Sequence, residues 1–295
     1  MFGMRQVDAI LTADIHLTEN TPISRIDNYV EAQDRKLDFL KQLEAKYDCP
    51  IIDAGDIFDY WKASPWLISR AYKKLPNSMY TIPGNHDLPE HSMQQYEKSA
   101  LHVLEVALSV RRLTKQPYDT HSFTIAGFAY GEKLEDVDAD IVVIHDLVYE
   151  GSPPWPNAVG YQPKDLFDIF TKPRLILVGH YHMALVAKSK DGRLLVNPGS
   201  MMRMTITQKD YKPRCYLYNF DDNEVEPVYF PIEEDVFDDK HIVEPKEKEE
   251  RLLAFIEKLD LEWDLKLSFR ANLEAFFKKN KVSKKVEDLI WQSLE

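Results

Sequence analysis

Five short clusters of polar residues could together bind metal ions. The clusters are Asp14-Ile15-His16, Gly55-Asp56-Ile57-Phe58-Asp59, Gly84-Asn85-His86-Asp87, the single residue His145, and Gly179-His180-Tyr181-His182. In the first and last clusters two polar residues stand two positions apart, so an extended chain turns both side chains to the same side. Carboxylate, imidazole and amide ligands without thiolates suit Mn, Fe or Zn. The clusters contain enough such side chains for two ions.

A pair of metal ions would give this site the chemistry of phosphoester hydrolysis. Two ions about 3.5 to 4 Å apart clamp a phosphoryl group and generate a nucleophile from water at neutral pH. A carboxylate such as Asp56 can bridge two ions through its two oxygens, whereas an imidazole cannot. Each cluster alone has an ordinary structural explanation, because a single aspartate after a strand often caps a helix. The hypothesis of a metal site therefore rests on the whole set.

Each cluster follows a short apolar run that predicts a buried strand. These runs cover residues 7–12, 50–54, 79–82, 141–144 and 174–178, and further strands are predicted over 194–197, 214–220 and 225–232. Helices are predicted around residues 39–47 and over 65–75, 94–109 and 163–170. Alternating strands and helices indicate a layered α/β fold, in which ligands gather at the carboxyl ends of the strands. The five clusters should therefore meet in one site.

The composition indicates a globular protein with one main core. The chain has 295 residues, of which 44% are hydrophobic and 29% charged, and its net charge is -12. Most of the negative charge lies in residues 221–250, and a basic stretch follows over 266–285, so the total does not exclude a nucleic-acid partner. No apolar run is long enough to span a bilayer, and we expect no cleaved leader and a cytoplasmic location. Cys49 and Cys215 lack metal-ligand spacing and are expected to be free thiols.

The clusters resemble the signature blocks of the calcineurin-like metallophosphoesterase superfamily, over roughly residues 7–200. The resemblance implies that family's α/β fold, a layered β-sandwich flanked by helices. Carried over by position, one ion would be bound by Asp14, His16, Asp56 and His182, and the other by Asp56, Asn85, His145 and His180. His86 would face the scissile phosphate, as a general acid for the leaving oxygen or as a cation that stabilises developing charge. Asp59 could orient His86 by a hydrogen bond.

Within the superfamily, the chain is most similar to SbcD-type DNA nuclease subunits. The similar stretches are Ala13-Asp14-Ile15-His16-Leu17, Gly55-Asp56-Ile57-Phe58-Asp59 and Asn197-Pro198-Gly199-Ser200. The resemblance implies a nuclease domain over residues 1–205, a small β-containing cap over 206–245 and a C-terminal helical segment over 246–295. It also implies two divalent ions, preferably Mn²⁺ with Fe²⁺ or Zn²⁺ as alternatives, and DNA as the substrate.

The same resemblance implies protein partners and substrate contacts. An SbcC-type coiled-coil ATPase would bind the C-terminal helices, and a homodimer would form through the helices at 65–75 and 94–109. Leu101, Leu104, Val106 and Leu108 could supply the apolar dimer contacts, although core packing would explain them equally well. Tyr60, Trp61 and Arg203 are candidate substrate-binding residues, since nucleobases stack on aromatic rings.

Two other functions remain open from the residues alone. A small-molecule phosphodiesterase or phosphatase would use the same metals, and the acidic overall charge supports it. A scaffold that keeps the fold without hydrolysis would bridge DNA ends or recruit an ATPase. The complete set of metal-binding residue types weighs against the scaffold.

Overall fold

The computed structural model describes residues 6–155 and 158–238, together with residues 277, 278 and 284. The chain divides into two compact units, one over Met1–Asp238 and the other over Asp239–Glu295. All five polar clusters belong to the first unit. The helical segment expected over 246–295 lies outside the described residues, apart from Phe277, Lys278 and Lys284, which are helical.

The first sheet has six strands in the order β12-β11-β1-β2-β3-β4. Its strands are β1 (Ala9–Thr12), β2 (Ile51–Asp53), β3 (Met79–Thr81), β4 (Arg111–Arg112), β11 (Arg214–Asn219) and β12 (Glu224–Tyr229). The four strands from β1 to β4 are parallel, whereas β11 and β12 pair in antiparallel fashion. The carboxyl ends of β1, β2 and β3 therefore lie at the same edge of the sheet.

The second sheet also has six strands, in the order β5-β6-β7-β8-β10-β9. Its strands are β5 (Tyr118–Asp119), β6 (Thr124–Phe128), β7 (Ile141–His145), β8 (Leu175–Gly179), β9 (Leu185–Lys188) and β10 (Leu194–Asn197). The central strands β6, β7, β8 and β10 are parallel, and His145 at the end of β7 is in register with Gly179 at the end of β8. This register brings the clusters that follow the two strands side by side.

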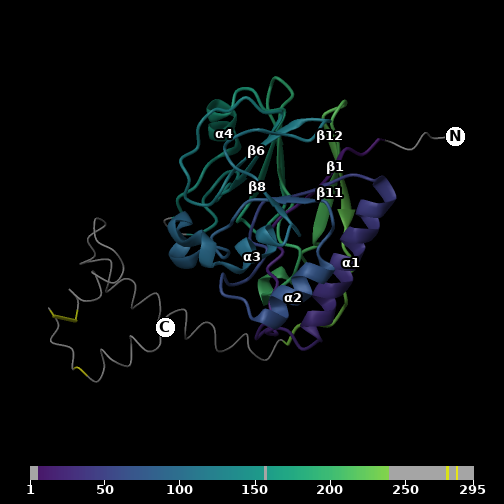
Figure 1. The fold of residues 1–295 in the computed structure, drawn as a ribbon, viewed down its shortest axis with the longest axis vertical. Coiled ribbons are helices and arrows are strands. Elements are labelled where there is room, and N and C mark those ends of the chain that lie inside the picture. The colour runs from purple at the N-terminus through teal and green to yellow at the C-terminus, as the bar shows by residue number, and fades with distance from the viewer. Residues whose placement is uncertain (1–5, 156–157, 239–276, 279–283, 285–295) are drawn as a thin grey trace. The chain divides into compact units, whose positions relative to one another are not determined.

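Helices cover the outer faces of both sheets. The α-helices are α1 (Tyr29–Tyr47), α2 (Pro65–Lys74), α3 (Ala100–Val106) and α4 (Pro163–Ile169), and the 3₁₀ turns are η1 (Pro89–His91), η2 (Met93–Lys98) and η3 (Ile206–Gln208). Short polar side chains fix where the helices begin: Asn28 accepts a hydrogen bond from the Glu31 amide, and Ser64 accepts one from the Leu67 amide. Figure 1 shows α1 along the sheet of β1, β11 and β12, and α4 on the side of β6 and β8.

The alternation of side chains along each strand produces a four-layer sandwich. In β1, Ala9 and Leu11 pack between the two sheets, while Ile10 faces the layer of α1, α2 and α3. In β7, Val143 packs between the sheets, and Ile144 faces the layer of α4. Both faces of the central strands are thus buried, as the continuous apolar runs predict, whereas the edge strands β9 and β12 are partly exposed. The predicted α/β sandwich flanked by helices is confirmed.

One predicted helix is divided in the structure, and two predicted strands form as expected but join the first sheet. The helix expected over 94–109 is two elements, η2 and α3, and it is interrupted at Ser99, whose side chain accepts a hydrogen bond from the His102 amide and begins α3. The strands expected at 214–220 and 225–232 are present as β11 and β12, but β11 pairs with β1. The described part of the segment 206–245 is therefore in the same compact unit as residues 1–205, as part of its first sheet and not as a separate cap.

In the part of the chain that the structure describes, no helix has the length and apolar character needed to cross a membrane.

Candidate metal centre

The five polar clusters meet at one end of the two sheets, where β1, β2, β3, β7 and β8 reach their carboxyl ends. Backbone hydrogen bonds hold the first two clusters together: the Asp14 amide donates to the Gly55 carbonyl at 3.0 Å, and the His16 amide donates to the Asp56 carbonyl at 2.9 Å. The Asp14 carboxylate accepts a hydrogen bond from the His180 amide at 3.1 Å, which ties in the last cluster. The meeting of the clusters in one site agrees with the sequence-based expectation.

Asp14, His16 and His182 form the first group that could hold a metal ion. One ligand atom from each residue lies within 4.8 Å of the others. The Nε2 atoms of His16 and His182 are 3.0 Å apart, and each lies 3.8 Å from Asp14 Oδ1. Asp14 and His16 are buried, whereas the side chain of His182 is 35% exposed. The group therefore has one side toward solvent.

Asp56, His145 and His180 form the second group. Asp56 Oδ2 lies 3.2 Å from His145 Nε2 and 3.6 Å from His16 Nε2, so this carboxylate stands between the two groups. Asn85 joins the second group, because its Oδ1 atom is 2.8 Å from His180 Nδ1 and 3.2 Å from His145 Nε2. The structure thus brings together all seven side chains that the sequence marks as candidate ligands.

The residues of both groups fit a pair of divalent ions. The Nε2 atoms of His16 and His182 are close enough for a hydrogen bond when one of them is protonated, and for binding to one shared cation when neither is. His145 Nδ1 lies 2.6 Å from the Ala54 carbonyl, which fixes the tautomer and turns the Nε2 atom into the site. The donor atoms are imidazole nitrogens and carboxylate or amide oxygens, which suit Mn, Fe or Zn.

The pKa values of the site reflect burial and close opposite charges. Burial by itself would lower the pKa of His145, but the Asp56 carboxylate raises it to about 9. Burial and the neighbouring His145 lower the pKa of His180 to about 4. Burial would raise the pKa of Asp56, yet the nearby imidazoles of His145 and His16 lower it below its usual range. At pH 7 these shifts keep the Asp56 carboxylate charged and His180 neutral, the forms in which both bind metal, whereas His145 is protonated and would release its proton when it binds an ion.

Four candidate ligands have a backbone conformation that residues other than glycine rarely adopt. Their φ angles are positive: 51° for Asp14, 48° for His16, 57° for Asp56 and 85° for His180. Such strained conformations cost of order 1–3 kcal/mol each and are concentrated at functional sites. They persist here because hydrogen bonds between the clusters fix the loops. These backbone conformations direct the four side chains toward the place where the candidate ligand atoms lie close together.

Gly84 allows two of the clusters to approach each other. A Cβ atom at this position would collide with the carboxylate and the backbone amide of Asp56. The Asp56 carboxylate also accepts a hydrogen bond of 2.8 Å from the His86 amide. A side chain at residue 84 would push these two loops apart, so the glycine is required by the packing of the centre.

His86 forms a third group that could hold a metal ion, with His16 and Asp59, and its ring contacts that of His16 with 4.7 Å between ring centroids. Its Nδ1 atom is 2.7 Å from the backbone oxygen of Asp59. The Asp59 carboxylate instead faces His16, with 3.3 Å between Oδ1 and Nδ1. Asp59 is thus hydrogen-bonded to His86 through its backbone carbonyl and not through its carboxylate. An aspartate after a strand can be recognised in a sequence. Whether its backbone carbonyl or its carboxylate contacts His86 depends on the conformation of the loop.

Sequence reasoning gave no role to Asp87, although it ends the third cluster. Its buried carboxylate accepts hydrogen bonds from the amides of Ile57 at 3.2 Å, Phe58 at 3.0 Å and Gly84 at 3.1 Å. Burial and the charge of Asp56 raise the pKa of Asp87 to about 7. Asp87 therefore fastens the second and third clusters to each other. The position of Asp87 directly after Asn85 and His86 could have indicated from the sequence that it belongs to the centre.

A cavity of about 580 Å³ opens over the centre. Its lining includes His16, Asp56, Asp59, His86, His180 and His182, together with Trp155, Tyr181, Met183, Met204, Thr205, Thr207 and Gln208. Tyr60 is exposed and Trp61 is partly buried, and neither lines this cavity. The expected substrate contact of Arg203 is not what the structure shows, because Arg203 is buried and donates to the carbonyls of Lys209 at 2.7 Å and Glu233 at 2.6 Å.

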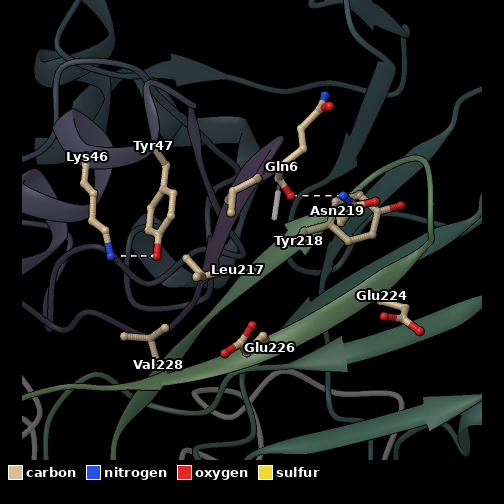
Figure 2. Close-up of a pocket in the computed structure, with 10 residues that line it drawn as sticks. Gln6, Lys46, Tyr47, Leu217, Tyr218, Asn219, Glu224, Glu226 and Val228 are labelled. Carbon is tan, nitrogen blue, oxygen red and sulfur yellow. Dashed lines mark hydrogen bonds between the residues drawn. The ribbon is translucent and has the colours of Figure 1, made fainter. Parts of the chain in front are cut away.

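A smaller hollow of about 220 Å³ lies over β11 and β12, away from the centre (Figure 2). Leu217 and Val228 form part of its floor, and Glu224 and Glu226 stand along β12. Polar groups of the lining residues are hydrogen-bonded to each other: Lys46 Nζ donates to the Tyr47 hydroxyl, and Asn219 Nδ2 donates to the Gln6 carbonyl. None of the residues that line it belongs to the five clusters.

Comparison with known proteins agrees with this site. Residues 8–220 match the model of the calcineurin-like phosphoesterase superfamily domain. No curated protein matches the chain in sequence. Among solved structures, a metallophosphoesterase from Sphaerobacter thermophilus is 15% identical with a TM-score of 0.37, and the match covers 76% of this chain and 89% of that chain. This structural similarity is too low to carry an argument, whereas the family match extends over most of the chain. The chain belongs to the calcineurin-like phosphoesterase superfamily.

Proposed function

We propose that the chain hydrolyses phosphodiester bonds with two divalent ions, and that DNA is its substrate. The observation that carries the proposal is the meeting of two ligand groups around one carboxylate, Asp56, with a further histidine, His86, at the rim. Two groups sharing a carboxylate are the arrangement expected for a pair of ions that act on one phosphoryl group. Membership of the phosphoesterase superfamily supports the reaction type.

The ligand assignment follows the geometry. Asp14, His16 and His182 would hold one ion, and Asn85, His145 and His180 the other, with Asp56 shared. When bound, the ions would offset the charge of the phosphate and lower the pKa of water enough to give a nucleophile near neutral pH. The chain's own contribution is to hold these side chains in position by the hydrogen bonds from His145 to Ala54 and from His180 to Asp14.

His86 is proposed to act on the leaving group. Its Nδ1 atom is held by the Asp59 carbonyl, which leaves Nε2 available on a side chain that lines the cavity. A protonated Nε2 can donate its proton to the departing oxygen, or as a cation it can stabilise charge that develops there. The hydrogen bond at Nδ1 orients the ring for either action.

The resemblance to SbcD-type nucleases supports the finer parts of the proposal. These parts are Mn²⁺ as the metal, DNA-end processing as the role, and an SbcC-type ATPase as the partner that binds the C-terminal segment. A homodimer through α2 and α3 is also proposed. On α3 and the turn after it, Leu101 and Leu104 belong to the core, whereas Val106 is 68% and Leu108 is 89% exposed. Of these four residues, Val106 and Leu108 are the two whose side chains are available for a dimer contact.

A small-molecule phosphodiesterase is a second candidate, and one observation favours it. Among the described residues that line the cavity over the centre, none is a lysine or arginine. A long DNA backbone is normally held by several basic side chains. A substrate with a single phosphodiester would need no such contacts beyond the metal centre. The complete ligand set argues against the third possibility, a scaffold without hydrolysis.

The test compares three substrates in the presence of Mn²⁺ and in the presence of EDTA. The substrates are linear double-stranded DNA, single-stranded DNA and bis-p-nitrophenyl phosphate. The proposal expects metal-dependent cleavage of DNA as well as of the small diester. Cleavage of the small diester with both DNAs intact would favour the second candidate. No metal-dependent hydrolysis of any of the three would contradict both.

A further inference from the structure

Four of the residues that line the cavity over the candidate metal centre have aromatic or thioether side chains. They are Trp155, Tyr181, Met183 and Met204, and together they are called the apolar wall. Trp155 is 48% exposed and Met183 is 44% exposed, so large apolar surfaces face the open cavity. The rings of Trp155 and Tyr181 lie near each other, with centroids 6.5 Å apart. Exposed apolar groups that surround one concave place beside a reactive centre indicate a binding site.

This wall stands directly beside the candidate ligands. Tyr181 lies between His180 and His182 in the chain, and Met183 follows His182. The same cavity is lined by His86, the residue proposed to act on the leaving group. A group attached to the phosphate would therefore reach the apolar wall while the phosphate is at the centre.

The segment Asn197-Pro198-Gly199-Ser200 holds the Tyr181 side of the wall in place. Asn197 is fully buried, and its Nδ2 atom donates to the Tyr181 carbonyl at 2.8 Å. The Ser200 amide donates to the His182 carbonyl at 3.1 Å. These bonds fix the loop that carries both the ligand histidines and the aromatic ring, so the wall is formed before any substrate binds.

A second set of buried side chains holds the Met204 side. Gln208 Oε1 accepts a hydrogen bond from the Met204 amide at 2.7 Å, and Gln208 Nε2 donates to the Ser200 hydroxyl at 3.1 Å. From the far side of the loop, Arg25 donates to the Arg203 carbonyl at 2.6 Å. Arg203 itself anchors the loop to the carbonyls of Lys209 and Glu233. Arg25 and Arg203 thus position the loop, and the guanidinium nitrogens that make these bonds are not available to bind substrate.

The chemistry of the wall selects the kind of group that would bind. Thioethers and aromatic rings make favourable contacts with flat π systems, and they offer no charge to a second phosphate. Among the described residues of the cavity there is no lysine or arginine either. The matching ligand is a flat, uncharged ring attached to the phosphodiester, and a nucleobase has these properties.

We propose that Trp155, Tyr181, Met183 and Met204 form a subsite for an unpaired nucleobase next to the scissile phosphate. This inference rests on the proposed phosphodiesterase function and specifies its substrate. A base can contact such a wall only after leaving a duplex stack, so the preferred substrates are unpaired strand ends and single nucleotide diesters. Paired DNA would have to open at its end first.

The test uses the full chain with Mn²⁺ and two chromogenic diesters that share a leaving group. Thymidine 5′-(p-nitrophenyl phosphate) carries a base, whereas methyl p-nitrophenyl phosphate carries none. Because stacking on a protein ring contributes about 1–3 kcal/mol per base, Trp155→Ala and Met183→Ala should each raise KM for the thymidine ester about fivefold or more. KM for the methyl ester should stay within about twofold of wild type.

Two further variants serve as controls. Trp155→Phe keeps an aromatic ring and should retain most of the affinity for the thymidine ester. Tyr229→Ala removes a half-exposed aromatic ring on β12 that does not line the cavity, and it should change neither KM. Thermal unfolding of each variant near the wild-type temperature establishes that the fold is intact.

The outcomes separate the subsite from the function on which it rests. If wild type hydrolyses both esters and the Trp155 and Met183 variants change both KM values equally or not at all, the subsite is wrong and the phosphodiesterase function stands. If wild type hydrolyses neither ester with Mn²⁺, the proposed function fails and the subsite fails with it. A selective rise in KM for the thymidine ester is the result that supports the subsite.

Discussion

His86 and Asp56 have different positions in the centre although their side chains are close neighbours. The Asp56 carboxylate stands between the two ligand groups and touches histidines of both. His86 shares a hydrogen bond with Asp56 only through its backbone amide, and its ring is held by the Asp59 carbonyl. Substitution of each residue can therefore test separately the proposed role of Asp56 in holding ions and the proposed role of His86 in acting on the substrate.

His86→Ala should reduce kcat for bis-p-nitrophenyl phosphate by about 100-fold or more, because general acid catalysis typically contributes 10²–10⁴-fold. The metal content measured by mass spectrometry should stay near that of wild type, since His86 belongs to neither of the groups assigned to the ions. His121→Ala removes an exposed histidine and is the matched control. Loss of metal from the His86 variant would make His86 a ligand and overturn its assignment.

Asp56→Ala should lower the occupancy of both ions, since the two groups share this carboxylate. Substitution of a residue that only supports a metal ligand already costs roughly 10–100-fold in metal affinity, and loss of a shared ligand should cost at least as much. Asp168→Ala is the control, because it removes an exposed carboxylate on α4 that belongs to none of the candidate metal groups. Both variants are measured by metal titration, and unchanged occupancy in the Asp56 variant would contradict the bridging role.

At the scale of secondary structure elements, α1 supports the loop that lines the cavity. Lys36 is buried on this helix, and its Nζ atom donates to the Met201 carbonyl at 2.7 Å. The Met201 amide in turn donates to the Asp14 carbonyl at 3.1 Å. Burial, with the charges of Arg25 and Arg203, lowers the pKa of Lys36 to about 7. The helix thus connects the first ligand cluster to the loop through a lysine that titrates near neutral pH.

The Lys36 pKa predicts how stability changes with pH. In the unfolded chain a lysine has a pKa near 10.4, so between pH 7 and 10 the unfolded state binds more protons and the folded state is favoured as pH rises. The free energy of unfolding of wild type should therefore rise by about 2 kcal/mol from pH 7 to pH 9, relative to that of Lys36→Met. Urea denaturation at both pH values measures this difference.

An exposed lysine supplies the control for the same experiment. Lys73 lies on α2 at an exposed position, and Lys73→Met should show no such change with pH relative to wild type. If the stability difference between wild type and Lys36→Met stays constant from pH 7 to pH 9, Lys36 is not held in a buried, low-pKa state.

In the molecule as a whole, the candidate metal centre lies where the two sheets meet. Its candidate ligands come from the carboxyl ends of three strands of the first sheet and two strands of the second. Removing the ions would leave several buried charges and ring nitrogens without partners at this junction. Metal binding should therefore stabilise the fold of residues 6–238 as a whole and not one loop alone.

Metal removal should lower the melting temperature. An ion at 100 times its Kd adds about 2.7 kcal/mol of stability, which corresponds to several degrees for a protein of this size. Calorimetry with EDTA and then with added Mn²⁺ measures the loss and the recovery. Asp56→Ala should show a smaller response to Mn²⁺ than wild type. An identical melting curve with EDTA and with Mn²⁺ would show that the ions do not stabilise the fold.

The proposed dimer is also a property of the whole molecule. Val106 and Leu108 are exposed at 68% and 89%, and charged residues in their place should prevent an apolar contact between copies. Val106→Glu with Leu108→Lys should convert a dimer into a monomer in light scattering. Ile26→Glu changes a residue that is 64% exposed elsewhere and should leave the dimer intact. A wild-type chain that is monomeric at all concentrations would contradict the proposed contact.

Local patterns in the amino-acid sequence predict the secondary structure elements and the types of the candidate ligands. The apolar runs that form β1, β2, β3, β7 and β8 are local patterns, and each places its polar cluster at the end of a parallel strand. Glycines such as Gly84 stand where close approach requires them. Because parallel strands end at one edge of a sheet, the meeting of the clusters could be predicted without knowing any distance.

Contacts between residues far apart in the chain became known only from the tertiary structure. It paired β11 with β1, although the two strands are about 200 residues apart in sequence, and so placed the expected cap in the first sheet. It buried Arg203 against the carbonyls of Lys209 and Glu233, and it formed the apolar wall from Trp155, Tyr181, Met183 and Met204. The physical reason is that burial and strand pairing depend on what the rest of the chain packs against, which no local pattern contains.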